Sequence, residues 1–168
     1  MNTITMKLDG SWQVAYGPVG KGSYADYHVL PAIPAQVPGA VHSDFISAGL
    51  IPEPLVDRND EACRWLEDME FWFTRSFSLA EDEMRARMVL TFHGLDTTAD
   101  IWLNGMSLGH CSNAFIPHEF DVTDVVREGA NELVVRLDQG LEEVKDKPMW
   151  EMGCMWNNAQ PRRAWMRK

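Results

Sequence analysis

Acidic side chains gather in one stretch of this 168-residue sequence, between positions 53 and 70. The stretch contains Glu53, Asp57, Asp60, Glu61, Glu67, Asp68 and Glu70. Two carboxyl groups held about 5–5.5 Å apart can act as acid/base and nucleophile in the hydrolysis of a glycosidic bond. Carboxylates are also favoured at the starts of helices, where they face the positive end of the helix dipole. Because short helices are predicted here, a solvated acidic surface explains the stretch better, and we assign no catalytic residue in this chain.

Tryptophans close to polar residues form a second candidate site, which would bind sugars. Sugar recognition uses an exposed aromatic face against C–H groups and planar polar side chains for the hydroxyl groups. The candidate residues are Trp65, Trp72, Asn59 and Glu70 in the middle of the chain, and Trp150, Trp156 and Asn157 near its end. Packing in the core is the alternative for the first two tryptophans. Packing against further domains is the alternative for the tryptophans near the end.

The remaining reactive side chains form no recognisable site. Cys63, Cys111 and Cys154 are widely spaced and include no C-x-x-C pair, which predicts reduced, mostly buried thiols rather than disulfides or a zinc site. His110 precedes Cys111, but a metal ion needs further ligands at a matching spacing. The serines that lie near histidines lack the G-x-S-x-G pattern of a nucleophile elbow. We therefore expect neither a metal nor a cofactor.

The composition is that of a globular protein with an acidic surface. The chain has 45% hydrophobic and 24% charged residues, and its formal net charge is −10. Such a charge would repel nucleic-acid phosphates, and no apolar run approaches the roughly 18 residues of a membrane span. Residues 1–7 lack the basic start and apolar core of a secretory signal, which predicts a cytoplasmic protein or one whose start has been removed. Basic residues cluster at 162–168, where a solvated terminal segment explains them better than a nucleic-acid patch.

Alternating hydrophobic residues predict strands at the centre of the chain. Over residues 88–93 and 99–104, successive side chains alternate between an apolar and a polar face. Asn104 and Gly105 then supply a residue pair that tolerates positive φ, so residues 106–110 should fold back as the second strand of a hairpin. A hydrophobic run, a connection and a tight hairpin indicate the kernel of an antiparallel sheet.

The first part of the chain predicts strands at its start and an edge segment after them. Strands are expected over residues 4–8 and 12–16, on either side of a turn. Three prolines, at positions 31, 34 and 38, predict an extended edge segment over residues 29–39, because proline cannot donate a hydrogen bond within a central strand.

Two short helices are predicted between this edge segment and the next strand. Over residues 42–48 the apolar residues fall on one face, and Gly49 suits the left-handed residue that ends many helices. A second helix is expected over residues 60–66, with Asn59 or Asp57 available as its cap.

The strands that follow complete the predicted fold class. A strand is predicted over residues 71–79, with its phenylalanines at alternate positions and therefore on one face. Arg75 falls on the same face. Because a buried charge is costly, Arg75 must lie at the rim of the sheet or pair with a carboxylate. Further strands are expected over residues 116–120 and 133–137, separated by a turn that closes at Gly129. Eight or so strands with few short helices predict an all-β protein, an antiparallel β-sandwich, as a single domain over residues 1–168.

Six blocks of the sequence resemble one known family. FHGLDTTADIWLNG, at residues 92–105, is similar to the signature of the N-terminal domain of family-2 glycoside hydrolases, especially the β-mannosidase branch. Matching blocks occur in order as VPGAVH at 37–42, AGLIPEP at 48–54, WFTRSF at 72–77, FDVTD at 120–124 and EGANEL at 128–133. The resemblance implies a galactose-binding-like jelly roll, in which the signature forms two adjacent strands.

The resemblance also implies a role. The domain would be non-catalytic, brace a (β/α)8 barrel that carries the catalytic carboxylates of a retaining enzyme, and line part of a β-mannoside pocket. In the family, the region matching residues 138–168 is an irregular excursion, and Arg167 and Lys168 resemble the pair at which it returns to the sheet. The next family block would begin beyond Lys168, so we expect an incomplete sheet, Ig-like and barrel domains as missing partners, and a segment through which two copies could pair as a homodimer.

Two other functions remain open from the residues alone. The aromatic content and the jelly-roll pattern also suit a freestanding carbohydrate-binding module. An exposed apolar segment over residues 139–168 would instead suit a structural interaction domain.

Overall fold

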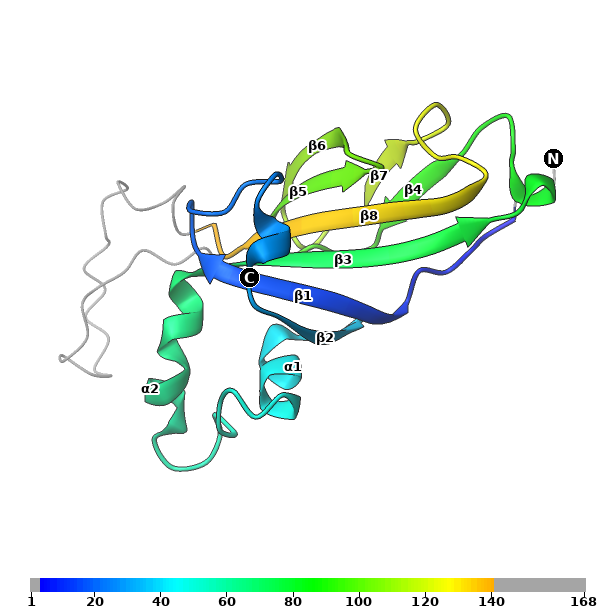
Figure 1. Cartoon of the computed structure of the whole chain (residues 1–168). Helices are drawn as coiled ribbons and strands as arrows, with labels where there is room; N and C mark the ends of the chain where they lie inside the picture. The colour runs from blue at the N-terminus through cyan, green and yellow to red at the C-terminus, as the bar shows by residue number, and fades with distance from the viewer. Residues whose placement is uncertain (1–3, 141–168) are drawn as a thin grey trace.

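Two antiparallel β-sheets make up most of the structure, a computed structural model that describes residues 4–140 (Figure 1). The strands are β1 (Gly10–Pro18), β2 (Ala32–Val37), β3 (Met69–Leu79), β4 (Val89–Phe92), β5 (Thr98–Leu103), β6 (Met106–Ser112), β7 (His118–Asp121) and β8 (Gly129–Asp138). The helical elements are α1 (Val41–Ser47), α2 (Asn59–Cys63) and the 3-10 turns η1 (Tyr27–Val29), η2 (Arg64–Asp68) and η3 (Glu81–Glu83). This arrangement confirms the predicted all-β, antiparallel fold with two short helices.

Within residues 4–140, the larger sheet has six strands in the order β2-β1-β3-β8-β5-β6, and β4 pairs with β7 in a two-stranded sheet. One face of the larger sheet carries the main core, where Val14 and Ile101 are 0% exposed and Leu133 is 1% exposed. Leu90 of β4 and Phe120 of β7 pack against the same core. Side chains alternate along a strand, so the residues between these core positions point to the opposite face of the sheet.

β5 and β6 form the predicted hairpin, with Leu103 opposite Met106. Asn104 and Gly105 adopt φ angles of 52° and 85°, the positive values that a type I′ turn requires. The pairing register shifts after Ile101, which places a bulge in the hairpin.

β4 and β5 are consecutive in the chain but belong to different sheets. The expectation that residues 92–105 form two adjacent strands is therefore wrong, since β4 pairs with β7 and β5 pairs with β6 and β8. Residues 93–97 connect the two layers, and Leu95, which is 7% exposed, fastens this connection to the core.

The first predicted helix is confirmed, and the cap of the second is wrong. α1 buries Phe45 completely, and Gly49 follows with a φ of 70°. α2 already begins at Asn59 and is preceded by Arg58, whose side chain caps nothing. Asp57 has a φ of 51° and so turns the chain before the helix instead of capping it. Within residues 4–140, no helix has the length and apolarity needed to cross a membrane.

The prediction for the edge segment is confirmed, whereas the strand over residues 4–8 is absent. β2 lies at one edge of the larger sheet, as the prolines at positions 31, 34 and 38 predict. Residues 4–9 join no sheet, although Leu8 packs on the core and accepts a hydrogen bond from Nε1 of Trp12 at 2.8 Å. Gly10, the first residue of β1, has a φ of 112° and pairs with Val37 of β2. Arg75 on β3 donates from Nη1 to the main-chain carbonyl of Ser11, so its partner there is a carbonyl and not a carboxylate.

Candidate functional site

Polar side chains form a row across the face of the larger sheet that points away from the main core. Trp72 of β3, Arg136 of β8, Asp100 of β5 and His110 of β6 are successive cross-strand neighbours. Each lies between residues that face the core, because the side chains of a strand alternate. Four strands therefore bring together residues from positions 72 to 136.

Arg136 is the centre of this row. Its Nε donates to Oε2 of Glu70 at 3.0 Å, and its Nη1 donates to Oδ2 of Asp100 at 2.8 Å. Its Nη2 lies 2.9 Å from Oε2 of Glu70 and 3.1 Å from Oδ2 of Asp138. The other oxygen of Asp100 lies 2.8 Å from Nδ1 of His110. We call these five residues the Arg136 cluster, and they connect β3, β8, β5 and β6.

Glu70 is the buried end of the Arg136 cluster, with 0% of its surface exposed. Besides Arg136, its carboxylate accepts hydrogen bonds from the main-chain N–H groups of Gly20 at 3.0 Å and Gly22 at 2.9 Å, and from Nε1 of Trp72 at 3.1 Å. A Cβ atom on Gly22 would overlap Oε1 of Glu70. The loop after β1 is therefore fastened to the sheet through this carboxylate.

The cluster becomes more exposed towards β6. The side chain of Arg136 is 19% exposed, that of Asp100 is 29% exposed and that of His110 is 52% exposed. Burial works to lower the pKa of Arg136, but hydrogen bonds and charge interactions with Glu70 and Asp100 outweigh it, so that the pKa is raised. Arg136 therefore stays charged and balances part of the negative charge of the three carboxylates around it.

Asp138 links the cluster to the place where the chain leaves the sheet. Its Oδ1 accepts a hydrogen bond from the main-chain N–H of Gly140 at 2.6 Å and another from Oγ1 of Thr98. Its Oδ2 is held by Arg136. The cluster thus fixes the chain at Gly140, the last residue that the structure describes.

An aromatic stack lies beside the cluster on the same face. Ring centroids are 5.4 Å apart for Tyr27 and Trp72, 5.5 Å for Trp72 and Trp102, and 5.1 Å for Trp102 and Tyr24. Tyr24 and Tyr27 come from the loop that Glu70 holds, so this loop covers part of the outer face. The stack stabilises the loop through apolar burial and ring contacts.

The structure separates the sequence-predicted sugar-binding residues into three groups. Glu70 and Trp72 lie together in the row but are 0% and 1% exposed, which favours the core-packing alternative for Trp72. Trp65 is half-buried, with its ring 5.7 Å from that of Phe45, and Asn59 is half-buried and donates from Nδ2 to the carbonyl of Glu53 at 3.0 Å. The third group, Trp150, Trp156 and Asn157, lies outside the described residues. Sugar contact by any of the seven stays a prediction.

Four residues of the cluster were not predicted from the sequence as members of this site: Arg136, Asp138, Asp100 and His110. The available signal was a charged residue at alternating positions of an apolar strand, as for Arg136 and Asp138 on either side of Leu137. That pattern predicts which side chains of a strand point to the outer face, but it does not predict which strands lie beside it. The register between β5 and β8, which the structure supplies, is what places Asp100 against Arg136.

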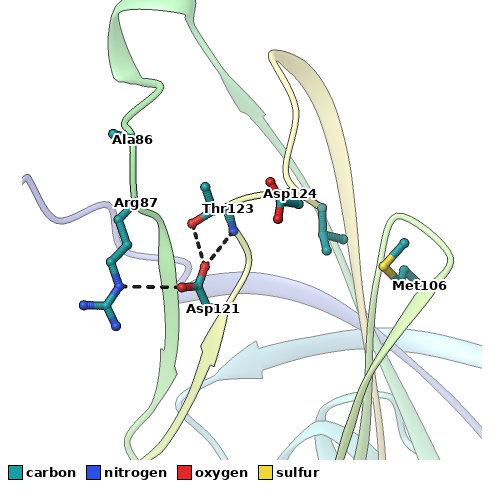
Figure 2. Close-up of a pocket in the computed structure, with 7 residues that line it drawn as sticks. Ala86, Arg87, Met106, Asp121, Thr123 and Asp124 are labelled. Atoms are coloured by element: carbon teal, nitrogen blue, oxygen red, sulfur yellow. Dashed lines mark hydrogen bonds and ion pairs between the residues drawn. The ribbon is translucent and has the colours of Figure 1, made fainter.

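A shallow depression of about 610 Å³ lies near β4 and β7 (Figure 2). It is lined by Ala86, Arg87, Met106, Asp121, Thr123, Asp124 and Val125. Asp121 accepts hydrogen bonds from the main-chain N–H of Thr123 at 3.1 Å and from its hydroxyl at 2.6 Å, and lies 3.6 Å from Nε of Arg87. Because these polar groups satisfy one another in the open, we assign no ligand to this depression.

The thiols and the metal ligands add no site within residues 4–140. Cys63 and Cys111 are free and buried, as predicted, and Cys154 lies outside the described residues. No group of three or more His, Cys, Asp or Glu side chains in that part of the chain is arranged to hold a metal ion.

An antiparallel β fold with one large and one small sheet fits the galactose-binding-like class of domains. The sequence model described as "Glycosyl hydrolase 2 galactose-binding domain-like" matches residues 12–168. The chain therefore belongs to this domain family of the family-2 glycosyl hydrolases.

Curated relatives include several β-mannosidases. Beta-mannosidase B of Thermothelomyces thermophilus is 32% identical over 165 residues, which cover 96% of this chain and 18% of that protein. Beta-mannosidase of Mus musculus is 36% identical over 126 residues, covering 72% of this chain and 13% of that protein. The chain thus spans less than a fifth of the length of these relatives.

Solved structures agree with this assignment. The crystal structure of beta-D-mannosidase from Dictyoglomus thermophilum matches with a TM-score of 0.73 and 34% identity, covering 86% of this chain and 17% of that chain. A β-glucuronidase from Ruminococcus gnavus matches with a TM-score of 0.59 over 78% of this chain and 21% of that chain, and its 20% identity makes this a likeness of fold alone.

Proposed function

We propose that this chain is the N-terminal, non-catalytic domain of a larger β-mannosidase-type glycoside hydrolase. There it would brace the catalytic domain and line part of the sugar pocket. The observation that carries the proposal is the 32% identity to beta-mannosidase B over 96% of this chain, a region that amounts to 18% of that relative. A relative of that length has ample further chain for a separate catalytic domain.

The carboxylates of the Arg136 cluster support a non-catalytic role. A retaining glycosidase needs two carboxyl groups about 5–5.5 Å apart that both reach the sugar. Glu70 is 0% exposed, and both of its oxygens accept hydrogen bonds from neighbouring groups, so it cannot reach a sugar. Asp100 and Asp138 are both engaged by Arg136. These groups hold strands together, and the proposal leaves the chemistry to carboxylates elsewhere in the larger enzyme.

The wall of the pocket is assigned to the end of the sandwich where β8 stops and β3 begins. Asn59 and Trp65 precede β3 there, and the chain continues past Gly140 towards Trp150, Trp156 and Asn157. Half-buried Asn59 offers the planar amide that suits sugar hydroxyl groups. These residues are the contribution that the domain would make to substrate binding.

Aryl glycosides test the proposal. The purified 168-residue chain should release no p-nitrophenol from p-nitrophenyl β-mannoside, whereas the longer enzyme that the proposal implies should hydrolyse it. In that longer enzyme, Asn59→Ala should raise KM, and Glu119→Gln, on the exposed face of β7, should leave KM and kcat unchanged. Hydrolysis by the 168-residue chain alone would overturn the non-catalytic role. A longer enzyme that cleaves a β-glucuronide but not a β-mannoside would overturn the substrate.

The freestanding carbohydrate-binding module is less well supported by the described residues. Glu70 and Trp72 are buried and Trp65 packs near Phe45, so these three offer no exposed aromatic platform. The isolated chain should therefore show no saturable change in tryptophan fluorescence with manno-oligosaccharides up to millimolar concentration, a limit that corresponds to about 4 kcal/mol of binding free energy. Saturation below that concentration would favour the binding module.

A further inference from the structure

The segment before β3 projects from the sandwich and ends in exposed apolar side chains. We call residues 50–68 the arm, and Figure 1 shows its α2 helix and the loop before it pointing away from the sheets. In that loop Leu55 is 93% exposed and Val56 is 50% exposed. The loop is well braced, because the main-chain N–H of Val56 donates to the carbonyl of Glu53 at 3.2 Å and Nδ2 of Asn59 donates to the same carbonyl at 3.0 Å. The two apolar side chains are thus held outwards by an ordered loop.

The charge around this apolar tip has one sign. Residues 53–61 contain four acidic side chains and one basic side chain, Arg58, which leaves a net charge of −3. Glu53, Asp57 and Asp60 are exposed beside the apolar pair. An apolar surface with a charged rim is typical of an interaction site, and its partner should carry apolar groups together with positive charge.

The last part of the same chain has this character. Residues 149–168 contain four basic side chains, Arg162, Arg163, Arg167 and Lys168, and one acidic side chain, Glu151, which leaves a net charge of +3. The segment also contains Met149, Trp150, Met152, Met155, Trp156, Trp165 and Met166. Its charge is opposite to that of the arm, and its large apolar side chains match the exposed tip.

The place where the chain leaves the sheet puts this segment within reach of the arm. Leu137 near the end of β8 lies opposite Phe71 near the start of β3, and η2 of the arm leads directly into β3. The ten residues of α2 and η2 extend about 15–20 Å. Residues 141–148 can span about 26–29 Å when extended. Residue 149 can therefore lie at the tip of the arm without any rearrangement of the sheets.

We propose that residues 149–168 dock on the tip of the arm. Leu55 and Val56 contact the tryptophan and methionine side chains, while Glu53, Asp57 and Asp60 face the arginines and Lys168. This contact is intramolecular and does not rest on the proposed enzymatic role. It gives residues 149–168 a binding partner within this chain.

A spin label on the arm tests the contact in the whole 168-residue chain. Cys154→Ser removes the thiol of the docking segment, and Cys63 and Cys111 are buried. Ala62→Cys, at an exposed position of α2 that is not one of the proposed contacts, then takes a nitroxide. We expect the nitroxide to broaden the indole N–H resonances of the three tryptophans of residues 149–168 at low salt, and reduction with ascorbate to restore them. Tryptophan-to-phenylalanine variants assign these resonances. No broadening of the three resonances would overturn the proposal.

Two controls decide where and how the segment binds. A nitroxide at Met106→Cys, which is 56% exposed in the hairpin, should broaden Trp102 and spare the three tryptophans of the segment. Glu53→Lys with Asp60→Lys should reduce the broadening from the arm label, whereas Glu81→Lys with Asp82→Lys, on exposed η3, should not. Equal broadening after charge reversal on the arm would overturn the charge contacts. Broadening that appears when isotope-labelled chain is mixed with separately spin-labelled chain would show a second copy as the occupant and overturn the intramolecular contact.

Discussion

Nδ2 of Asn104 donates a hydrogen bond to Oδ1 of Asn131 at 2.8 Å, which joins the β5–β6 turn to the start of β8. The same Nδ2 donates to the carbonyl of Val125 at 2.9 Å, and Oδ1 of Asn104 accepts from the main-chain N–H of Glu132 at 3.0 Å. Asn131 is 2% exposed and holds both the N–H and the carbonyl of Arg127. Two adjacent amides thus satisfy main-chain groups of two loops that carry no regular hydrogen-bond ladder.

Asn104→Asp should destabilise the fold, because a carboxylate offers no donor to Val125 or to Asn131. Each buried group left unpaired costs about 1–3 kcal/mol, and we expect a loss in that range for each of the two lost bonds. Urea unfolding followed by tryptophan fluorescence measures it. Asn113→Asp is the matched control, because exposed Asn113 accepts a hydrogen bond from the N–H of Phe115 and a carboxylate can do the same. Equal stability of the two variants would contradict the role of the amide pair.

Glu70→Gln should cost about 3–5 kcal/mol of unfolding free energy, as expected when one partner of a buried ion pair is removed. The carboxamide nitrogen is a donor and would replace one of the two acceptor oxygens of Glu70. At the position of Oε1 it would face the donors of Gly22 and Trp72, and at the position of Oε2 those of Gly20 and Arg136. Thermal and urea unfolding of the purified variant give the loss. Glu119→Gln makes the same chemical change on an exposed strand position and should shift stability little. A loss below about 1 kcal/mol for Glu70→Gln would mean that the cluster does not stabilise the sheet.

Gly22→Ala should destabilise the loop that covers the outer face, because the added methyl group overlaps the carboxylate of Glu70 and lies 3.0 Å from Nε1 of Trp72. The loop would have to move off Glu70, which would also disturb the stack of Tyr27 on Trp72. Gly20→Ala is the comparison: its φ of 71° strains an alanine, but no atom lies within 4 Å of the new group. Near-ultraviolet circular dichroism should report a larger change for Gly22→Ala. The reverse order would contradict the packing of Gly22 on the carboxylate.

Asp44 should make stability fall with rising pH. It is 8% exposed, Oδ1 accepts a hydrogen bond from the N–H of Gln36, and Oδ2 is buried without a partner among the described residues. Burial raises the pKa of Asp44, and the hydrogen bond from Gln36 opposes this only in part. The protonated form is therefore favoured by folding: its stabilising contribution is present below the ordinary aspartate pKa of about 3.9 and is lost as pH rises through the folded value.

Asp44→Asn removes this titration and keeps an acceptor for Gln36. The unfolding free energy of the wild type should therefore fall relative to that of the variant as pH rises from about 4 through the raised pKa. Urea unfolding at half-unit pH steps gives the two curves. Parallel curves for Asp44→Asn and the wild type would contradict the burial effect.

Period-two patterns and turn residues were enough to predict most strands, since apolar residues at every second position of β5 and β8 pack on the main core. The Asn104-Gly105 turn was equally clear, because few residue pairs adopt two positive φ angles. Residues 4–8 show the limit of this argument. Their alternation is good, but a strand also needs a neighbouring strand, and pairing with β2 begins only at Gly10.

The sites were harder to predict than the strands, because they depend on which strands are neighbours. Glu70 and Trp72 were predicted as sugar-binding residues from their residue types. In the structure, the carboxylate of Glu70 binds Arg136, which lies 66 positions later in the chain. The burial of Trp72 could not be predicted from the strand pattern either. Trp72 alternates with the phenylalanines of β3 and so belongs to the outer, polar face of the strand. It is nevertheless 1% exposed, because the loop with Tyr24 and Tyr27 folds over it. The predicted cap of α2 was wrong for a local reason: Asp57 adopts a left-handed conformation, with a φ of 51°.

The position of β8 in the larger sheet has a consequence for synthesis on the ribosome. β8 lies between β3 and β5, yet among the strands of residues 4–140 it is the last of this sheet to be made. A nascent chain that has reached residue 128 holds β1, β2 and β3 as one piece and the β5–β6 hairpin as another, each with an open edge facing the gap that β8 will fill. Such late, long-range pairing slows folding and leaves unpaired edges exposed meanwhile. The two pieces therefore cannot join through β8 until its ten residues are made, and a chain that stalls before them exposes two sheet edges that can pair with other chains.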